Sequence, residues 1–292
     1  MIGPRQSSPT AHVQPIALNL APLGFLEVAP PALVAIAAEA GFGSVSLRMR
    51  PAVAGGSHYP LAVGSPLARE TLARLRQTGI GVLQAELVPL EKTTDVGACR
   101  PLLEAATALG ATRLVVTGDD PDPAVVAGKL AEIADLAREY GMTVDVEFMR
   151  FRCLATLGQA LAAVAAAGRD NVAVMVDALH LVRSGGGAAD VAAADPRRLG
   201  VLQLCDAPLA APAPERLAAE ARESRLLPGR GELPLGALLD AMPAHTILAA
   251  EVPLAARVPA VPPHERARAI YEATVELLTA HRPVPDVDPP GG

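Results

Sequence analysis

Short apolar runs alternate with longer segments of helical periodicity along most of the chain. The runs are rich in aliphatic and β-branched residues, which predicts strands at 16–20, 44–49, 81–86, 113–117, 143–148, 172–177, 200–205 and 246–251. Helices are predicted between them, at 31–40, 69–78, 96–109, 123–140, 154–167 and 264–280, and a glycine follows several of these segments. This alternation is typical of βα units that build a parallel sheet.

Eight such units in one chain favour an α/β fold in which the sheet closes into a single (β/α)₈ TIM barrel. An open doubly wound sheet is the alternative, but no glycine-rich phosphate fingerprint follows the first run. The segment 207–225 is rich in Ala and Pro and is expected to be a long βα loop, not a domain linker. We therefore expect a flexible leader at 1–14, the barrel at 15–282 and a disordered tail at 283–292.

Composition narrows the classes of partner. Hydrophobic residues make up 51% of the 292 residues but aromatic residues only 2%, so aliphatic side chains must fill the core. The formal charge of −6 and the lack of basic clusters argue against nucleic-acid binding. No apolar run is long enough for a membrane span, and the dispersed Cys99, Cys153 and Cys205 indicate neither disulfides nor a zinc knot. We expect a soluble cytoplasmic protein, and the sequence leaves a homo-oligomer open.

Polar residues interrupt four consecutive predicted strands near their carboxyl ends. Glu147, Asp177 and Glu251 close three of them, and Gln203 lies within the fourth. Any one of these residues taken alone is better explained as a solvated strand end or a helix cap. Four in succession need a shared explanation, because strand ends converge at the mouth of a barrel and buried charge is costly unless it is paired or binds a metal.

Three carboxylates and one amide oxygen form an all-oxygen ligand set. Such a set suits one hard or borderline divalent ion, with Mn²⁺ or Mg²⁺ favoured and Co²⁺ as a further choice. Glu147 and Glu251 are also the candidate acid/base pair, because they come from different strands and can flank a substrate. The chemistry expected is proton abstraction next to the carbonyl of a small polyhydroxylated substrate.

Other polar residues near the predicted mouth are candidates for substrate binding. His180 follows Asp177 by three residues and Asp206 follows Gln203 by three, so both lie just beyond a strand end. Arg225 offers positive charge to a carboxylate or phosphate. Glu86 and Arg48 face the mouth only if the strand register is favourable, since a shift of one residue turns a side chain away.

The chain resembles the xylose-isomerase-like barrels, which include sugar-phosphate isomerases/epimerases, ketose 3-epimerases, inosose dehydratases and 3-dehydroshikimate dehydratases. The resemblance covers nearly the whole chain, and its clearest pieces are AAEAGF at 37–42, VEF at 146–148, DALH at 177–180, QLCD at 203–206, PGRGEL at 228–233 and AEVP at 250–253. It implies a metal held by Glu147, Asp177, Gln203 and Glu251, with His180 contacting the substrate. The epimerases usually carry His at this ligand position. This chain carries Gln203 there, as some bacterial 3-dehydroshikimate dehydratases carry Gln.

These features favour a metal-dependent isomerase or epimerase acting on a sugar or keto-polyol through an enediolate. A dehydratase of the dehydroshikimate or inosose kind is the alternative, supported mainly by Gln203. Both share the first step, so the ligand set alone does not separate them. A second alternative is a barrel that binds a small ligand without catalysis.

Overall fold

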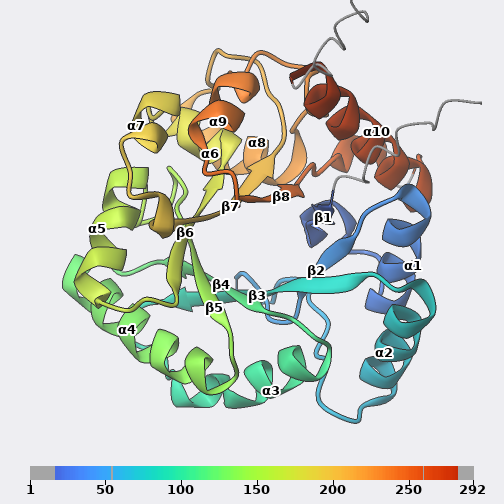
Figure 1. Ribbon diagram of the computed structural model, residues 1–292, viewed down its shortest axis with the longest axis horizontal. Helices are drawn as coiled ribbons and strands as arrows, with labels where there is room; N and C mark the ends of the chain where they lie inside the picture. The colour runs from blue at the N-terminus through green and yellow to red at the C-terminus, as the bar shows by residue number, and fades with distance from the viewer. Residues whose placement is uncertain (1–16, 54, 259, 282–292) are drawn as a thin grey trace, which may run out of the picture.

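Eight parallel strands form a closed barrel in which each strand pairs with the next along the chain and β8 pairs with β1. This computed structural model describes residues 17–53, 55–258 and 260–281. Helices surround the barrel, as Figure 1 shows in a view nearly down its axis. The architecture confirms the predicted single (β/α)₈ barrel, while the predicted leader at 1–14 and tail at 283–292 lie outside the described residues.

The secondary structure follows the predicted alternation. The strands are β1 (Leu18–Leu20), β2 (Ser44–Arg48), β3 (Gly81–Leu90), β4 (Arg113–Gly118), β5 (Thr143–Glu147), β6 (Val172–Asp177), β7 (Leu199–Leu204) and β8 (Ile247–Ala250). The α-helices are α1 (Pro30–Ala40), α2 (Pro66–Thr78), α3 (Arg100–Ala108), α4 (Pro123–Glu139), α5 (Leu157–Ala167), α6 (Ala178–Arg183), α7 (Ala188–Ala192), α8 (Leu217–Glu223), α9 (Leu235–Ala241) and α10 (Pro263–His281). Short 3-10 helices are η1 (Pro22–Phe25), η2 (Gly97–Cys99), η3 (Pro196–Arg198), η4 (Pro214–Arg216) and η5 (Ala255–Arg257).

Helix ends are fixed by local interactions that can be read from the residues. The Thr156 side chain accepts a hydrogen bond from the Gln159 backbone, and the Gln159 side chain accepts one from the Thr156 backbone, which starts α5. Gly41 and Gly168 end α1 and α5 with positive φ values of 108° and 64°. None of the described helices is long and apolar enough to cross a membrane.

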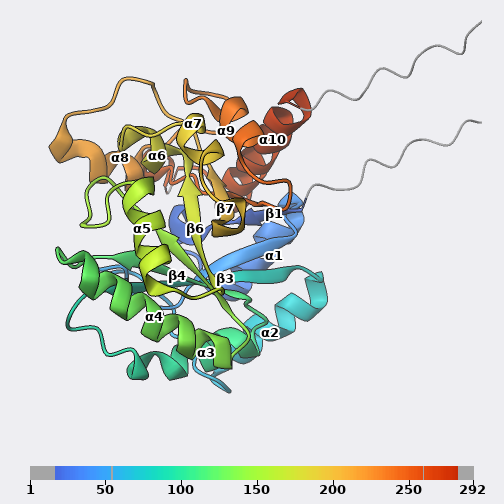
Figure 2. The same ribbon diagram turned by 60° about the vertical axis from the view of Figure 1, so that its left-hand side comes forward.

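The predicted loop at 207–225 differs from expectation, because it contains η4 and α8. The sequence of α8, LAAEARE, consists of good helix formers, and this local preference prevails over the Ala- and Pro-rich composition of the wider segment. Figure 2 shows α8 projecting beyond the ring of helices at one end of the barrel. The insertion therefore carries ordered side chains beyond the strands.

A polar network fills the end of the barrel interior where most strands begin. The Ser46 hydroxyl donates to Asn19 at 2.9 Å and also lies 3.0 Å from Gln84, and the Gln84 amide donates to Asp145 at 2.9 Å. Arg113 donates two hydrogen bonds of 2.6 Å to the same Asp145 carboxylate. Each charge in this layer thus has a partner.

Only glycine fits at position 200, because side chains of this network pack directly against its Cα atom. A Cβ atom at Gly200 would lie 2.5 Å from the Arg113 guanidinium and 3.1 Å from an Asp145 oxygen. Above the network, an apolar layer of Leu87, Val115, Met175, Val201 and Ala249 crosses the barrel. The layer separates the polar network from the carboxyl ends of the strands, so the two polar ends do not exchange partners.

Removing the acid from the polar network is expected to destabilise the barrel strongly. In Asp145→Ala the Arg113 guanidinium stays buried without its carboxylate, which costs about 3–5 kcal/mol of unfolding free energy. Urea unfolding followed by circular dichroism measures the loss. Glu139→Ala is the control, because the Arg100–Glu139 pair is exposed and should leave the urea midpoint unchanged. Equal midpoints for the two variants would show that the buried pair is not needed.

Candidate metal centre and active site

The four predicted metal ligands all lie buried at the carboxyl ends of their strands. Glu147 ends β5 and Asp177 ends β6, while Gln203 is the register partner of Asp177 on β7. Glu251 directly follows β8 and donates its backbone N–H to Leu204 at 3.1 Å. Because register partners on parallel strands share a face, Asp177 and Gln203 lie side by side at the mouth of the barrel.

His180 lies closer to this group than a substrate-binding residue alone requires. Atoms of Glu147, Asp177 and His180 that can bind a metal all lie within 4.8 Å of one another. Asp177 fixes the start of α6 by accepting the His180 N–H at 2.9 Å, and this cap holds the imidazole over the site. The sequence therefore predicted the location of His180, and the geometry adds it to the residues that could ligate an ion.

The imidazole of His180 is neutral at physiological pH. Burial lowers its pKa to about 4, an effect that outweighs the attraction of Asp177. Its Nε2 atom lies 3.9 Å from a Glu147 carboxylate oxygen. The contact is therefore between a carboxyl group and a neutral ring, which leaves a ring nitrogen free to accept a proton or bind an ion.

The side-chain oxygen of Gln203 is buried and has no hydrogen-bond partner among the described residues. Leaving such an oxygen unpaired costs about 1–3 kcal/mol. A divalent cation would satisfy it, because amide oxygens are ordinary ligands for Mg²⁺ and Mn²⁺. The residues present thus fit the ion that the acidic side chains favour.

Arg225 supplies the main positive charge between these acids. Its Nη1 atom donates to Asp177 at 2.5 Å and its Nη2 atom lies 3.0 Å from a Glu251 oxygen. The Nε atom donates to the Ala221 carbonyl at 2.8 Å, so the side chain is anchored at both ends. All three charged groups are buried, which makes this a network in which each charge depends on the others.

The three acids respond differently to this environment. Burial raises the pKa of Asp177, but the charges of Arg225 and His180 and the hydrogen bonds that both residues donate outweigh it together, so the pKa lies below its ordinary value. Burial together with the charges of Glu251 and Asp177 raises the pKa of Glu147 well above its ordinary value. Burial raises the pKa of Glu251 to about 7 despite Arg225. Asp177 is therefore the permanently ionised acid, and the other two can hold a proton.

Asp206 lies just beyond β7 and holds the following loop in place. Its carboxylate accepts the backbone N–H groups of Ala207 at 2.9 Å and Leu233 at 3.0 Å, and its own backbone pairs with Leu226. A Cβ atom at Gly231 would lie 2.5 Å from that carboxylate, so glycine is required where the chain returns. Asp206 is not among the pocket-lining residues, and its contacts support the position of nearby Arg225.

Glu86 also lies below the pocket surface. It forms a 2.9 Å ion pair with Arg48, its register partner on β2, and of the two only Arg48 lines the pocket. One Glu86 oxygen and the Arg48 Nε atom have no hydrogen-bond partner among the described residues. The register of β2 and β3 is thus the one that turns the side chains of Arg48 and Glu86 towards the mouth.

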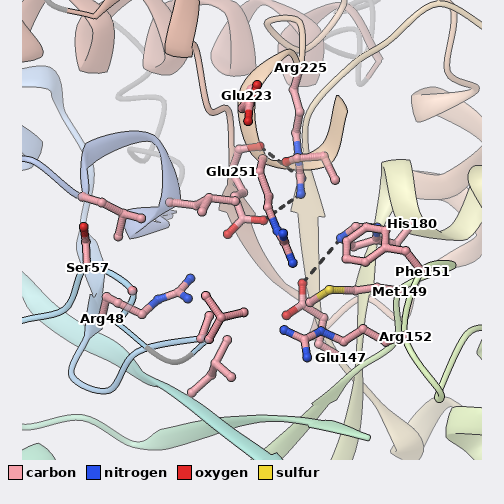
Figure 3. Close-up of a pocket in the computed structure, with 18 residues that line it drawn as sticks. Arg48, Ser57, Glu147, Met149, Phe151, Arg152, His180, Glu223, Arg225 and Glu251 are labelled. Atoms are coloured by element: carbon pink, nitrogen blue, oxygen red, sulfur yellow. Dashed lines mark hydrogen bonds and ion pairs between the residues drawn. The ribbon is translucent and has the colours of Figure 1, made fainter. Parts of the chain in front are cut away.

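The site opens into a cavity of about 300 Å³ with apolar walls and a charged floor. Glu147 and Glu251 lie on different sides of this floor, and His180 and Arg225 border it (Figure 3). Ser57, from the loop after β2, also contributes to the wall. A cavity of this size suits a small metabolite.

Several wall residues were not singled out from the sequence. Met149, Phe151 and Arg152 follow β5 directly, and Arg222 comes from α8. The run Phe148-Met149-Arg150-Phe151-Arg152 carries two of the four phenylalanines and comes directly after Glu147, which could have indicated a site loop. Arg222 depends on the path of a long insertion and gave no such indication.

A curated relative shares local sequence similarity with the chain. The inosose isomerase of Halalkalibacterium halodurans is 34% identical over 79 residues, which cover 26% of this chain and 28% of the relative. The matched stretch therefore spans less than a third of that enzyme.

Solved structures with the same fold align over almost the whole chain. The IolI protein with a bound zinc atom has a TM-score of 0.73 at 18% identity and covers 92% of this chain and 100% of its own. The probable 3-DHS dehydratase AsbF of Bacillus anthracis has a TM-score of 0.71 at 13% identity, covering 89% of this chain and 99% of its own. These TM-scores show a shared fold.

A family model matches residues 34–278, a range that includes the four strand ends, the Arg225 loop and most of α10. With the closed barrel and its buried acidic mouth, this match places the chain in the xylose isomerase-like TIM barrel family.

Proposed function

We propose that this chain is a divalent-metal-dependent isomerase or epimerase that moves a proton next to the carbonyl of a small polyhydroxylated substrate. The observation that carries the proposal is the unpaired, buried oxygen of Gln203 beside Asp177, at a mouth that also holds Glu147 and Glu251. A divalent cation would satisfy this oxygen, and the two glutamates supply carboxyl groups on different sides of the cavity. The local similarity to an inosose isomerase supports this reaction class.

Glu147, Asp177, Gln203 and Glu251 would hold the ion, and His180 lies near enough to Glu147 and Asp177 to join them. The oxygen ligands favour Mn²⁺ or Mg²⁺, whereas the imidazole makes the set compatible with Co²⁺ or with the zinc named for the IolI structure. A bound ion supplies Lewis-acid stabilisation of the negative charge that develops on the substrate oxygens.

Proton transfer, side-chain positioning and substrate hydrogen bonding are assigned to different protein residues. One glutamate takes the proton from the carbon next to the carbonyl. A proton returned to the opposite face of that carbon inverts it, whereas a proton delivered to the neighbouring carbon moves the carbonyl. Arg225 keeps Asp177 ionised and holds Glu251 in place. Neutral His180 is placed to accept or donate a hydrogen bond to a substrate hydroxyl.

A dehydratase is the second candidate, favoured by Gln203. A neutral amide replaces the imidazole that epimerases usually carry here, and the fold is shared with a probable 3-DHS dehydratase. The same proton abstraction then ends with loss of a β-hydroxyl group as water. The difference lies in the fate of the substrate after the shared first step.

We expect about one divalent ion per chain, with affinity that depends on Gln203. Gln203→Leu removes a ligand oxygen and should weaken Mn²⁺ binding at least ~10-fold in calorimetric titrations. Gln203→His should keep an ion and shift preference towards Co²⁺ or Zn²⁺. Gln77→Leu, on the surface of α2, is the control and should bind like the wild type. Unchanged affinity in Gln203→Leu would remove Gln203 from the ligand set.

Glu251→Gln separates proton transfer from metal binding. The amide keeps a ligand oxygen but cannot act as a base, so the variant should retain its ion while turnover falls at least ~100-fold. Elemental analysis and kcat measurements test the two parts separately. Glu276→Gln, at an exposed carboxyl on α10, should leave both values unchanged. Wild-type turnover in Glu251→Gln would exclude Glu251 as the base.

The fate of the substrate is expected to be isomerisation or epimerisation. Mass spectrometry after incubation with keto-sugars, inososes and dehydroshikimate should show a product of unchanged mass and altered chromatographic retention. A product lighter by one water would identify the dehydratase instead. Incubation with the Glu251→Gln variant controls for spontaneous reaction.

A further inference from the structure

Four arginines line the cavity from different elements. Arg48 comes from the end of β2, Arg152 from the loop after β5, Arg222 from α8 and Arg225 from just beyond α8. Figure 3 shows Arg48 and Arg152 on different sides of the cavity, with Arg225 farther along its wall. A neutral polyol needs hydrogen-bonding groups but no concentration of positive charge, so these arginines call for a separate explanation.

Three of the four have acidic partners within the protein. Arg48 pairs with Glu86 at 2.9 Å and Arg152 with Asp119 at 2.7 Å, while Arg225 is held between Asp177 and Glu251. The pairs do not use every donor, because the Nε atoms of Arg48 and Arg152 are buried without an acceptor among the described residues. These two Nε atoms are buried, so Arg48 and Arg152 contribute to the cavity mainly through their positive charge.

Arg222 differs from the other three because it forms no ion pair within the described part of the chain. Its guanidinium lies over the ring of Phe151, 5.3 Å from the ring centroid, and both residues line the cavity. Arg222 is the exposed member of the four. Partial burial and the charge of Arg152 lower its pKa, the adjacent Glu223 carboxylate raises it, and the charge of Arg48 lowers it. Like charges held close together in this way attract an anion.

We propose that Arg222, with Arg152 and Arg48 beside it, binds the carboxylate of an acidic substrate. The inference rests on the proposed function and narrows its substrate class to polyhydroxylated oxo acids. A single unpaired guanidinium matches the single charge of a carboxylate better than the double charge of a phosphate ester. The Arg222 guanidinium lies over the ring of Phe151 and has no ion-pair partner among the described residues, and a guanidinium can bind a carboxylate through two parallel N–H donors.

Calorimetry with matched probes tests this subsite on the Mn²⁺-loaded protein. Quinate and myo-inositol are cyclic polyols of the same ring size, and of the two only quinate carries a carboxylate. We expect quinate to bind at least ~10-fold more tightly, because hydrogen bonds to a charged group contribute about 1.5–3 kcal/mol. Glucose 6-phosphate, the phosphate probe, should bind more weakly than quinate.

Variants assign the preference to a residue. Arg222→Gln should weaken quinate binding at least ~10-fold and leave myo-inositol binding within about 2-fold. Arg230→Gln is the matched control, because Arg230 lies on the surface in an exposed pair with Glu276. Equal affinities for quinate and myo-inositol, tighter binding of glucose 6-phosphate, or an Arg222→Gln variant that binds quinate like the wild type would each overturn the subsite.

The same titrations distinguish this inference from the proposed function. Arg222 contacts none of the candidate metal ligands through a hydrogen bond or ion pair within the described residues, so Arg222→Gln should bind Mn²⁺ like the wild type. Failure to bind Mn²⁺ would overturn the proposed function, and the preference for quinate can still be measured on the metal-free protein. Mn²⁺ binding without a preference for quinate would overturn only the carboxylate subsite.

Discussion

Charge buried inside the barrel has to be neutralised there, and this constraint organises the structure. At one end the Arg113 guanidinium and the Asp145 carboxylate neutralise each other through two short hydrogen bonds. At the other end Arg225 lies between Asp177 and Glu251. The apolar layer between these ends prevents either group from using the other's partners. The charges at each end must therefore be neutralised by side chains at that end or by a bound ligand.

The two ends meet this requirement to different degrees. The polar network around Asp145 uses its own side chains and leaves no member without a partner among the described residues. The mouth instead contains unpaired atoms on Gln203, Glu86 and Arg48, together with carboxyl groups whose pKa values are raised. Unsatisfied hydrogen-bonding capacity is costly in a folded protein, and here it is concentrated where a substrate and an ion would remove the cost.

The fold could be predicted because parallel strands buried on both faces appear in the sequence as short apolar runs between amphipathic helices. The same burial made Glu147, Asp177, Gln203 and Glu251 visible, since a polar residue in such a run is costly. Whether these residues ligate an ion stays a prediction. Asp206 shows a limit of this reasoning, because capping a loop and binding a ligand use the same residue type at the same offset from a strand. Arg152 and Arg222 lie in connecting segments without periodicity, and their convergence depends on how the loops fold.

The apolar layer of Leu87, Val115, Met175, Val201 and Ala249 also has a consequence for how such barrels diverge. The polar network that stabilises the fold lies on the side of this layer where the strands begin. The loops that border the cavity, such as the one bearing α8, lie on the side where the strands end. Exchanging an arginine on those loops leaves the polar network intact, so a new specificity can arise without a compensating change in the scaffold.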